Sequence, residues 1–145
     1  MHLLTKLQVI GLKYHEDIIQ KIPRSEVKLI FEAVERATLA LFPNKKLIIE
    51  TCGSYRRGKV SSGDVDVIIT TESNYDEVNQ IRGMLPAIVE KLEEDGFLVE
   101  RLGALKYSHT GSNTIFGICK LQDDPSRLFR RLDIKVYPRS QFAFA

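Results

Sequence analysis

The chain has 145 residues, of which 43% are hydrophobic and 28% charged, and this composition is typical of one globular domain with a buried core. The net charge of +2 is too small to indicate nucleic-acid binding by itself, and no apolar run approaches the roughly 20 residues of a membrane-spanning helix. The first residues also lack the basic, apolar and small-residue segments of a secretory signal peptide.

The first third of the chain is predicted to be helical. Proline and serine set the boundaries, because proline disfavours the α region in the residue before it and serine is a good N-cap. The predicted elements are a loop or helix end over residues 3–10, a break at Gly11, a short helix over 14–21 stopped by Pro23, and a helix with Ser25 as its N-cap that extends to about Leu41. The helical spacing predicts a buried face of Val27, Ile30, Phe31, Val34 and Leu41.

The rest of the chain alternates apolar strands with helical segments. The first predicted elements are a strand over 47–52, a short helix over 54–58, a strand over 64–70 and a short helix or loop over 74–83. A helix follows, with Pro86 in its first turn, and Gly96 ends it. The last elements are strands over 97–102 and 114–121, joined by a polar turn over 109–113, and a strand over 131–137. This mixture predicts an α+β fold, with a mixed or mostly antiparallel sheet and helices packed on one face.

Charged residues and cysteines are unevenly placed along the chain. Residues 72–100 carry eight acidic side chains against two basic ones, so this surface is expected to face away from any polyanion. Basic residues gather instead around residues 21–24, 56–59 and 127–139, which fits a protein that meets phosphate on one side. Cys52 and Cys119 each lie in an apolar run and are predicted to be buried free thiols, which fits a reducing compartment.

The stretch from Gly53 to Thr70, GSYRRGKVSSGDVDVIIT, contains the strongest functional signal. Asp64 and Asp66 lie two residues apart in an apolar strand, so both carboxylates are expected to project from the same face. Two like charges this close repel each other unless a cation neutralises them. A divalent metal ion with oxygen ligands is the simplest such cation, and Mg²⁺ is typically held by one or two carboxylates together with substrate phosphates.

The residues before these aspartates are suited to bind phosphate. A helix that began at Ser54 would present free N–H groups to an anion, and Arg56 or Arg57 could add a charge-assisted contact. Ser61, Ser62 and Gly63 form a second small-residue turn directly before Asp64. Asp-x-Asp and Gly-Ser are each weak signals alone, because many surface segments contain them, whereas their combination in this order and spacing is specific.

This combination resembles the nucleotidyltransferase motif of Gly-Ser followed by Asp-x-Asp, and the fuller string GSYRRGK…SGDVDV is similar to the palm of family X DNA polymerases such as polymerases beta, lambda and mu. Gly11 to Val27, GLKYHEDIIQKIPRSEV, resembles the segment that joins the fingers of that family to its palm. Arg130 to Ala145, RRLDIKVYPRSQFAFA, resembles the strand with the third catalytic aspartate. The resemblance therefore covers nearly the whole chain.

The resemblance implies roles for individual residues. Asp133 faces away from its apolar neighbours and would join Asp64 and Asp66 in holding two Mg²⁺ ions, with Mn²⁺ as an alternative, for in-line phosphoryl transfer. The nucleotide triphosphate would lie on Gly53, Ser54, Arg57, Ser62 and Gly63, with Lys21 and Arg24 as basic residues nearby. Arg131 would contact the primer phosphate and orient Asp133, and Lys135 is a second candidate DNA contact. Tyr55 is expected to belong to the core, and Arg56 to be structural.

The resemblance also implies the organisation and function of the chain. Residues 1–24 would form the end of the fingers and a linker, and residues 25–145 an isolated palm without lyase domain or thumb. The implied function is DNA-directed DNA synthesis in nuclear DNA repair, by gap filling or end joining, with a DNA primer-template and a dNTP as partners and a monomeric enzyme away from membranes. Two alternatives stay open, which are a template-independent nucleotidyltransferase and a non-catalytic fragment that binds metal, nucleotide or DNA.

Overall fold

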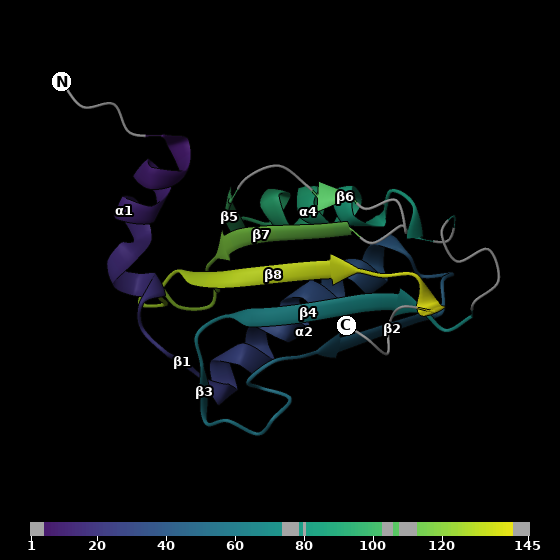
Figure 1. The fold of residues 1–145 in the computed structure, drawn as a ribbon, viewed down its shortest axis with the longest axis horizontal. Helices are drawn as coiled ribbons and strands as arrows, with labels where there is room; N and C mark the ends of the chain where they lie inside the picture. The colour runs from purple at the N-terminus through teal and green to yellow at the C-terminus, as the bar shows by residue number, and fades with distance from the viewer. Residues whose placement is uncertain (1–4, 74–78, 80, 103–105, 108–112, 141–145) are drawn as a thin grey trace.

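The computed structural model describes residues 5–73, 79, 81–102, 106–107 and 113–140. Within these residues the chain forms a six-stranded sheet with helices layered against it (Figure 1). In spatial order the strands are β2 (Leu47–Thr51), β4 (Val65–Thr71), β8 (Arg130–Val136), β7 (Asn113–Cys119) and β5 (Leu98–Arg101), with β6 (Lys106–Tyr107) paired to β7. β4 and β8 are parallel and the other pairs are antiparallel, so the predicted α+β fold is confirmed and its sheet is mixed.

Two helices, α2 (Arg24–Leu41) and α4 (Met84–Glu94), cover one face of this sheet (Figure 1). Strands alternate their side chains between two faces, so every second residue of β4 and β8 points toward these helices. The strand residues that join the core in this way are Val65, Val67, Ile69, Leu132, Ile134 and Val136. The residues between them are left on the opposite face, where polar side chains can gather.

The packing of α2 agrees with its predicted apolar stripe, with one difference in degree. Val27, Ile30 and Val34 are buried against the sheet, whereas Phe31 and Leu41 are half-buried at the margin of the core. The buried residues have the spacing i, i+3, i+7, so they lie on one face of the helix, as predicted. α4 packs beside α2 and carries Pro86 in its first turn, and Gly96 follows it with a φ of 75°.

The start of α2 differs from the sequence prediction. Pro23 is the N-cap, with φ −60° and ψ 148°, and Ser25 lies inside the first turn, so the prediction of Ser25 as the N-cap is wrong. The first helical N–H, that of Arg24, donates to the carbonyl of Val60 at 3.1 Å. A tertiary contact thus satisfies one of the N–H groups that have no partner within the helix, and the local sequence does not indicate this contact.

α1 (Lys6–Ile18) is longer at its start than predicted and ends earlier. Thr5 and Gln8 form a capping box that begins the helix, and the helix continues through Gly11, so the predicted break there is wrong. An isolated glycine costs a helix only about 1 kcal/mol, which the cap and tertiary packing offset. Tyr14 packs with Ile118 of β7 and lies 4.6 Å from Phe129 between ring centroids, which attaches α1 to the end of the sheet.

A second, two-stranded sheet joins the linker after α1 to the segment before Asp64. β1 (Ile22–Pro23) pairs antiparallel with β3 (Ser61–Ser62), so that Ile22 is the register partner of Ser62. Residues 22–23 are therefore extended, and the predicted helix over 14–21 ends at Ile18 instead. This small sheet places the linker directly beside the turn that leads into the central aspartates.

Several predictions fall partly on residues outside the described part of the chain. These are the segment 74–83, of which 74–78 and 80 are not described, and the polar turn over 109–113, of which only Asn113 is described and belongs to β7. The domain boundary between residues 24 and 25 stays a prediction. Among the described helices none is long and apolar enough to span a bilayer.

Candidate metal and nucleotide site

Three carboxylates gather on the face of the sheet opposite α2 and α4. Asp66 of β4 and Asp133 of β8 are register partners in the parallel pair, and Asp64 directly precedes β4. One carboxylate oxygen from each residue lies within 4.8 Å of those from the other two. The structure thus brings together the three aspartates that the sequence singled out, because the β4–β8 pairing aligns positions that are 67 residues apart.

The buried polar atoms of this site fit a metal ion next to an anion. Ser62 Oγ, Arg131 Nε and Asp133 Oδ1 are buried and have no hydrogen-bond partner among the described residues. Buried polar atoms are nearly always paired, so unpaired atoms in β8 and in β3, the strand directly before Asp64, indicate a missing ligand. The carboxylate oxygen requires a donor or a cation, and the arginine N–H and serine hydroxyl can donate to phosphate oxygens.

Burial and the crowding of like charges raise the pKa values of two of these carboxyl groups. Burial, followed by the charge of Asp66 and a hydrogen bond with it, raises the pKa of Asp133 to about 7. Burial and the charge of Asp64 also raise the pKa of Asp66, against the opposing charges of Lys135 and Arg131. Without a cation, Asp133 therefore holds a proton under conditions in which an ordinary aspartate is ionised. A bound divalent ion would displace that proton.

We expect the affinity of the chain for Mn²⁺ to rise with pH up to about pH 7, by up to about tenfold per pH unit. The reason is that the metal ion competes with the proton on Asp133, whose pKa is raised to about 7. The same shift makes the metal-free protein less stable as pH rises, since between about pH 4 and 7 the folded state keeps a proton that the unfolded state has lost. Titration with Mn²⁺, followed by electron paramagnetic resonance, and urea unfolding measure the two effects.

The Asp133→Asn variant is the control for this pH dependence, because it removes the titrating group. Its Mn²⁺ affinity should be weaker at every pH and should depend less on pH. A metal affinity of the unmodified chain that is constant from about pH 5 to about pH 8 would contradict the prediction.

The turn over residues 53–60, here called the 53–60 turn, connects β2 to β3 and is not the short helix that the sequence predicts over residues 54–58. Its described main-chain hydrogen bonds run from Arg57 to Gly53 (3.2 Å), from Gly58 to Tyr55 (3.0 Å) and from Lys59 to Ser54 (3.1 Å). Gly53 and Gly58 have positive φ values of 71° and 83°, which interrupt a helical path. The predicted helix N-terminus at Ser54 is therefore wrong, and phosphate binding by this turn stays a prediction.

This turn lies directly against the carboxylates. The N–H of Cys52, at the end of β2, donates to the main-chain carbonyl of Asp66 at 3.1 Å. Cys119 is buried as predicted, but Cys52 is only half-buried, and burial together with the charges of Asp66 and Asp64 raises the pKa of its thiol. Arg57 Nη2 lies 3.5 Å from Ser54 Oγ, so two of the predicted phosphate-binding groups are adjacent.

The remaining predicted nucleotide-binding residues lie along the small β1–β3 sheet. Ser62 is buried in β3, and Gly63 is exposed between β3 and Asp64, where an added Cβ would meet no atom within 4 Å. Lys21 is exposed directly before β1. Its described contact is made by its carbonyl, which accepts a hydrogen bond from Arg130 Nη1 at 3.2 Å, so the role of its ammonium group in nucleotide binding stays a prediction.

We expect Gly53→Ala to weaken Mn²⁺ binding by about tenfold and to destabilise the fold by about 1–2 kcal/mol. A Cβ at Gly53 would lie 2.8 Å from Asp66 Oδ2, and the φ of 71° is unfavourable for alanine. Gly58→Ala is the matched control, because Gly58 has a φ of 83° but no atom within 4 Å of an added Cβ. It should share the loss of stability and keep metal affinity, whereas equal metal affinities of the two variants would refute the role assigned to the Gly53–Asp66 contact.

Alternation along β8 places Arg131 and Lys135 on the same face as Asp133. Their charges lower the pKa of Asp66, which shows that both act on the carboxylate cluster. Tyr55 packs half-buried against the core, as expected, and Arg56 forms an exposed ion pair with Glu50 at 3.7 Å.

The sequence analysis missed the role of Arg24, whose side chain binds the 53–60 turn. It also missed the half-buried position of Cys52 beside Asp66. The sequence contains no signal for the contact of Arg24 with this turn, because the residues that Arg24 contacts are 31 and 35 positions away.

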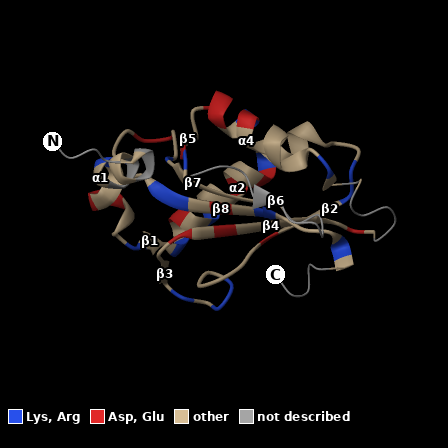
Figure 2. Ribbon diagram, turned by 45° about the horizontal axis from the view of Figure 1, so that its top comes forward, with Lys and Arg blue, Asp and Glu red and all other residues tan. Residues whose placement is uncertain are grey.

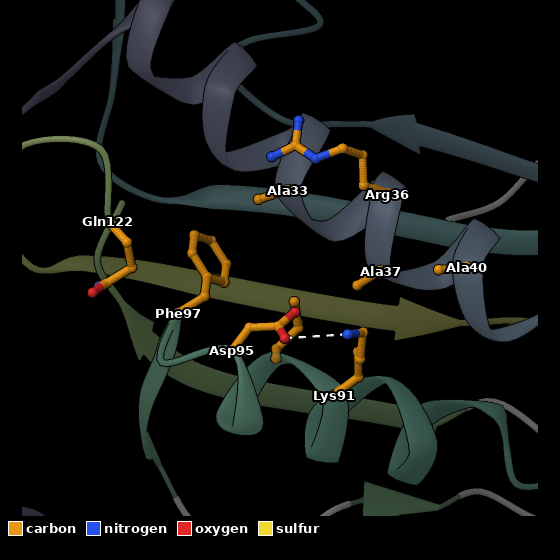
Figure 3. Close-up of a pocket in the computed structure, with 9 residues that line it drawn as sticks. Ala33, Arg36, Ala37, Ala40, Lys91, Asp95, Phe97 and Gln122 are labelled. Atoms are coloured by element: carbon orange, nitrogen blue, oxygen red, sulfur yellow. Dashed lines mark hydrogen bonds and ion pairs between the residues drawn. The ribbon is translucent and has the colours of Figure 1, made fainter.

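The surfaces around the site differ in charge in the predicted way. Exposed acidic side chains lie along α4, on the helical side of the sheet, and basic ones along the 53–60 turn (Figure 2). A hollow of about 350 Å³ also lies on the helical side, between α2 and α4 (Figure 3). Alanines of α2, Phe97 and the Lys91–Asp95 ion pair (3.2 Å) line it, and it contains none of the three aspartates.

Comparisons with known proteins agree with this geometry. Residues 21–139 match the model of the DNA polymerase beta palm. The chain is 36% identical to DNA polymerase lambda of Arabidopsis thaliana over 145 residues, which covers 97% of the chain and 26% of the relative. It is 37% identical to DNA polymerase lambda of Rattus norvegicus over 143 residues, covering 98% and 23% respectively. It is 31% identical to the human DNA-directed DNA/RNA polymerase mu over 137 residues, covering 94% and 24%.

The chain thus spans about a quarter of the length of the relatives that it matches. The matched segment contains the complete sheet and all three aspartates of the carboxylate cluster. Both the sequence match and the fold therefore lead to one assignment: the chain belongs to the family X DNA polymerases and contains their palm domain.

Proposed function

We propose that this palm catalyses the transfer of a nucleotide from a dNTP to the 3′-hydroxyl of a DNA primer. The observation that carries the proposal is the cluster of Asp64, Asp66 and Asp133 next to unpaired polar atoms of Ser62 and Arg131. Asp64 and Asp66 would hold two divalent ions, and Asp133 would hold the one nearer the primer. When bound, such ions activate the attacking hydroxyl and neutralise charge on the transferred phosphoryl group.

The side chains around the cluster would bind and orient the two substrates. Ser54 and Arg57, which lie side by side, and Ser62 with Gly63 would bind the triphosphate from two turns, with Lys21 at the margin. Arg131 would hold the primer phosphate and keep Asp133 in place, since it is the next residue of β8 on the same face. Catalysis of this kind consists mostly of positioning and charge stabilisation.

The proposed partners are a DNA primer-template and a dNTP, with Mg²⁺ as the proposed ion and Mn²⁺ as a substitute. Arg131 and Lys135 give the carboxylate face positive charge where the DNA backbone would lie. We further propose, from membership of the family alone, a role in DNA repair in the nucleus and a monomeric enzyme.

The test is Mg²⁺-dependent extension of a labelled primer in a one-nucleotide gap, with the chain and its Asp66→Ala variant. Extension by the chain and none by the variant is expected. Equal extension of a single-stranded primer would favour the template-independent alternative, and retained extension by the Asp66→Ala variant would contradict the proposed site.

A second candidate function is binding of metal and nucleotide without turnover. The observation that favours it is the carboxylate cluster with the unpaired donors of Ser62 and Arg131, since these groups can bind metal and phosphate whether or not turnover follows. Binding of Mg–dNTP with no product on gapped DNA would support this alternative for the chain by itself. The same assay on the chain joined to the flanking segments of a relative would then show whether positioning of the DNA is what the palm lacks.

A further inference from the structure

Arg24, the first residue of α2, is attached to the 53–60 turn through both its side chain and its main chain. Its Nη1 donates to the carbonyl of Tyr55 (2.7 Å) and to that of Lys59 (3.3 Å). Its guanidinium carbon lies 3.9 Å from the centroid of the Tyr55 ring, and its own N–H donates to the Val60 carbonyl at 3.1 Å. One residue at the start of a helix thus holds several parts of a turn that has no regular secondary structure.

The direction of these hydrogen bonds bears on phosphate binding. In a planar trans peptide the C=O and the following N–H point in opposite directions, so a Tyr55 carbonyl held toward Arg24 directs the N–H of Arg56 away from it. The N–H groups of Ser54 and Arg56 have no acceptor among the described residues. Free N–H groups in an irregular turn are donors for an anion. Arg24 therefore helps to fix the orientation of a donor that faces away from α2.

The same contacts occupy the side chain of Arg24 itself. Nη1 is shared between two carbonyls and the guanidinium plane lies over an aromatic ring, so both are engaged in contacts within the protein. The turn also exposes Arg56, Arg57 and Lys59. These three positive charges repel the guanidinium group of Arg24. The two carbonyl oxygens and the aromatic ring that contact Arg24 offset this repulsion.

We propose that Arg24 is a positioning residue, which holds the 53–60 turn in the form that binds the triphosphate and does not bind the phosphate itself. The proposal rests on the nucleotide site of the proposed function. Arg24 would therefore act through the turn and not, as the resemblance implies, as a basic residue beside the triphosphate.

The experiment compares Arg24→Lys, Tyr55→Leu and the double variant with the unmodified chain. Lysine keeps the charge but loses the planar fork and the stacking, and leucine removes only the ring. Arg36→Lys is the matched control, because Arg36 is an exposed arginine on the same helix and lines the hollow between α2 and α4. Three quantities are measured: hydrogen exchange of the Arg57, Gly58 and Lys59 amides, affinity for Mn²⁺ alone, and affinity for Mg–dATP.

For Arg24→Lys we expect faster exchange of these three amides by about tenfold and a Mg–dATP affinity weaker by about tenfold, with Mn²⁺ affinity unchanged. Tyr55→Leu should produce smaller changes of the same kind. The double variant should lose less than the sum of the single losses, since both changes disrupt one contact. Arg36→Lys should behave like the unmodified chain. A merely structural role would lower the melting temperature without separating nucleotide affinity from metal affinity.

Unchanged amide exchange in Arg24→Lys would overturn the proposal, whether or not nucleotide binds. A direct phosphate contact would also overturn it, and would appear as weaker Mg–dATP binding with unchanged exchange and no effect of Tyr55→Leu. If the unmodified chain binds no Mg–dATP but the exchange difference is present, the proposed function fails and the hold of Arg24 on the turn is still supported.

Discussion

Replacement of Asp133 by asparagine is expected to abolish nucleotidyl transfer and, at the same time, to stabilise the metal-free protein at about pH 8. Asp133 is the β8 member of the carboxylate cluster, and its Oδ1 is buried with no hydrogen-bond partner among the described residues. Asparagine has almost the same shape but no charge, so it cannot replace a carboxylate as a ligand for a divalent ion. The loss of activity and the gain in stability have one cause, which is the removal of the Asp133 charge.

The underlying cause is the buried position of Asp133 beside other carboxylates. Burial and the charge of Asp66 raise the pKa of Asp133 to about 7, so its ionised form opposes folding at higher pH. Removal of that charge lifts this opposition to folding. The function that the cluster is proposed to serve requires the same crowding, since several carboxylates are needed around the ions.

The expected loss is at least about a thousandfold in primer extension, which corresponds to several kcal/mol of lost charge stabilisation in the transition state. Mn²⁺ affinity should fall as well, and this measurement applies whether or not the chain by itself turns over. Urea unfolding of the metal-free protein should give a higher midpoint for the variant than for the unmodified chain.

Asp95→Asn is the control for this prediction. Asp95 is exposed at the end of α4, on the helical side of the sheet, and pairs with Lys91. It should leave extension and Mn²⁺ affinity unchanged. Extension by Asp133→Asn within tenfold of the unmodified chain would remove Asp133 from the catalytic site, whatever the stability of the variant.

The carboxylate cluster could be predicted from sequence because it depends on strand alternation. Asp64, Asp66 and Asp133 all interrupt apolar runs with period two, and this pattern alone predicts that their side chains project from the face away from the core. What the sequence does not contain is the pairing of β4 with β8, which makes Asp66 and Asp133 neighbours. The resemblance to family X polymerases provided that link.

The errors in the sequence analysis have physical causes in contacts between distant segments. The 53–60 turn has a helix-like start but contains Gly53 and Gly58 at positive φ. Ser25 is a good N-cap by local rules, but the extended strand β1 leads straight into α2 and Val60 satisfies its first N–H. At the start of α2 a tertiary contact thus overrides a local preference, and local preferences amount to about 1 kcal/mol per residue.

The sequence patterns indicate part of one missed contact, the buried ion pair of Glu26 and Arg130. Glu26 precedes Val27 at the start of the buried stripe of α2, and alternation along β8 places Arg130 on the same side as Leu132. A buried acid and a buried base were thus predictable, although the pairing between them was not, because the two residues are 104 positions apart.

This pair leads to the second large prediction, which is that Arg130→Met destabilises the fold by about 3–5 kcal/mol. Arg130 Nε and Nη2 donate to the two carboxylate oxygens of Glu26 at 2.6 and 3.0 Å, and both side chains are less than a tenth exposed. Methionine fills a similar volume but leaves the carboxylate buried with only Arg127 Nη1 at 3.5 Å. The midpoint and slope of urea unfolding measure the loss.

Two further variants test the physical reason for this loss. Arg130→Met combined with Glu26→Leu should recover most of the stability, because a buried ion pair replaced by apolar side chains of similar size is close to neutral. Arg101→Met is the surface control, since Arg101 also binds a carboxylate through two hydrogen bonds, to Glu93 at 3.0 and 2.7 Å, but both side chains are more than a third exposed. It should cost less than about 1 kcal/mol.

Arg130 also links the carboxylate cluster to the small β1–β3 sheet. Arg130 begins β8, three residues before Asp133, and its Nη1 also donates to the Lys21 carbonyl at 3.2 Å beside β1. β1 in turn pairs with Ser62, so one guanidinium connects the strand of the carboxylate cluster with the turn proposed for the triphosphate. A double variant as unstable as Arg130→Met would show that the hydrogen bonds from Arg130 to the carbonyls of Lys21 (3.2 Å) and Gln20 (3.5 Å), rather than an unpaired Glu26, account for the loss.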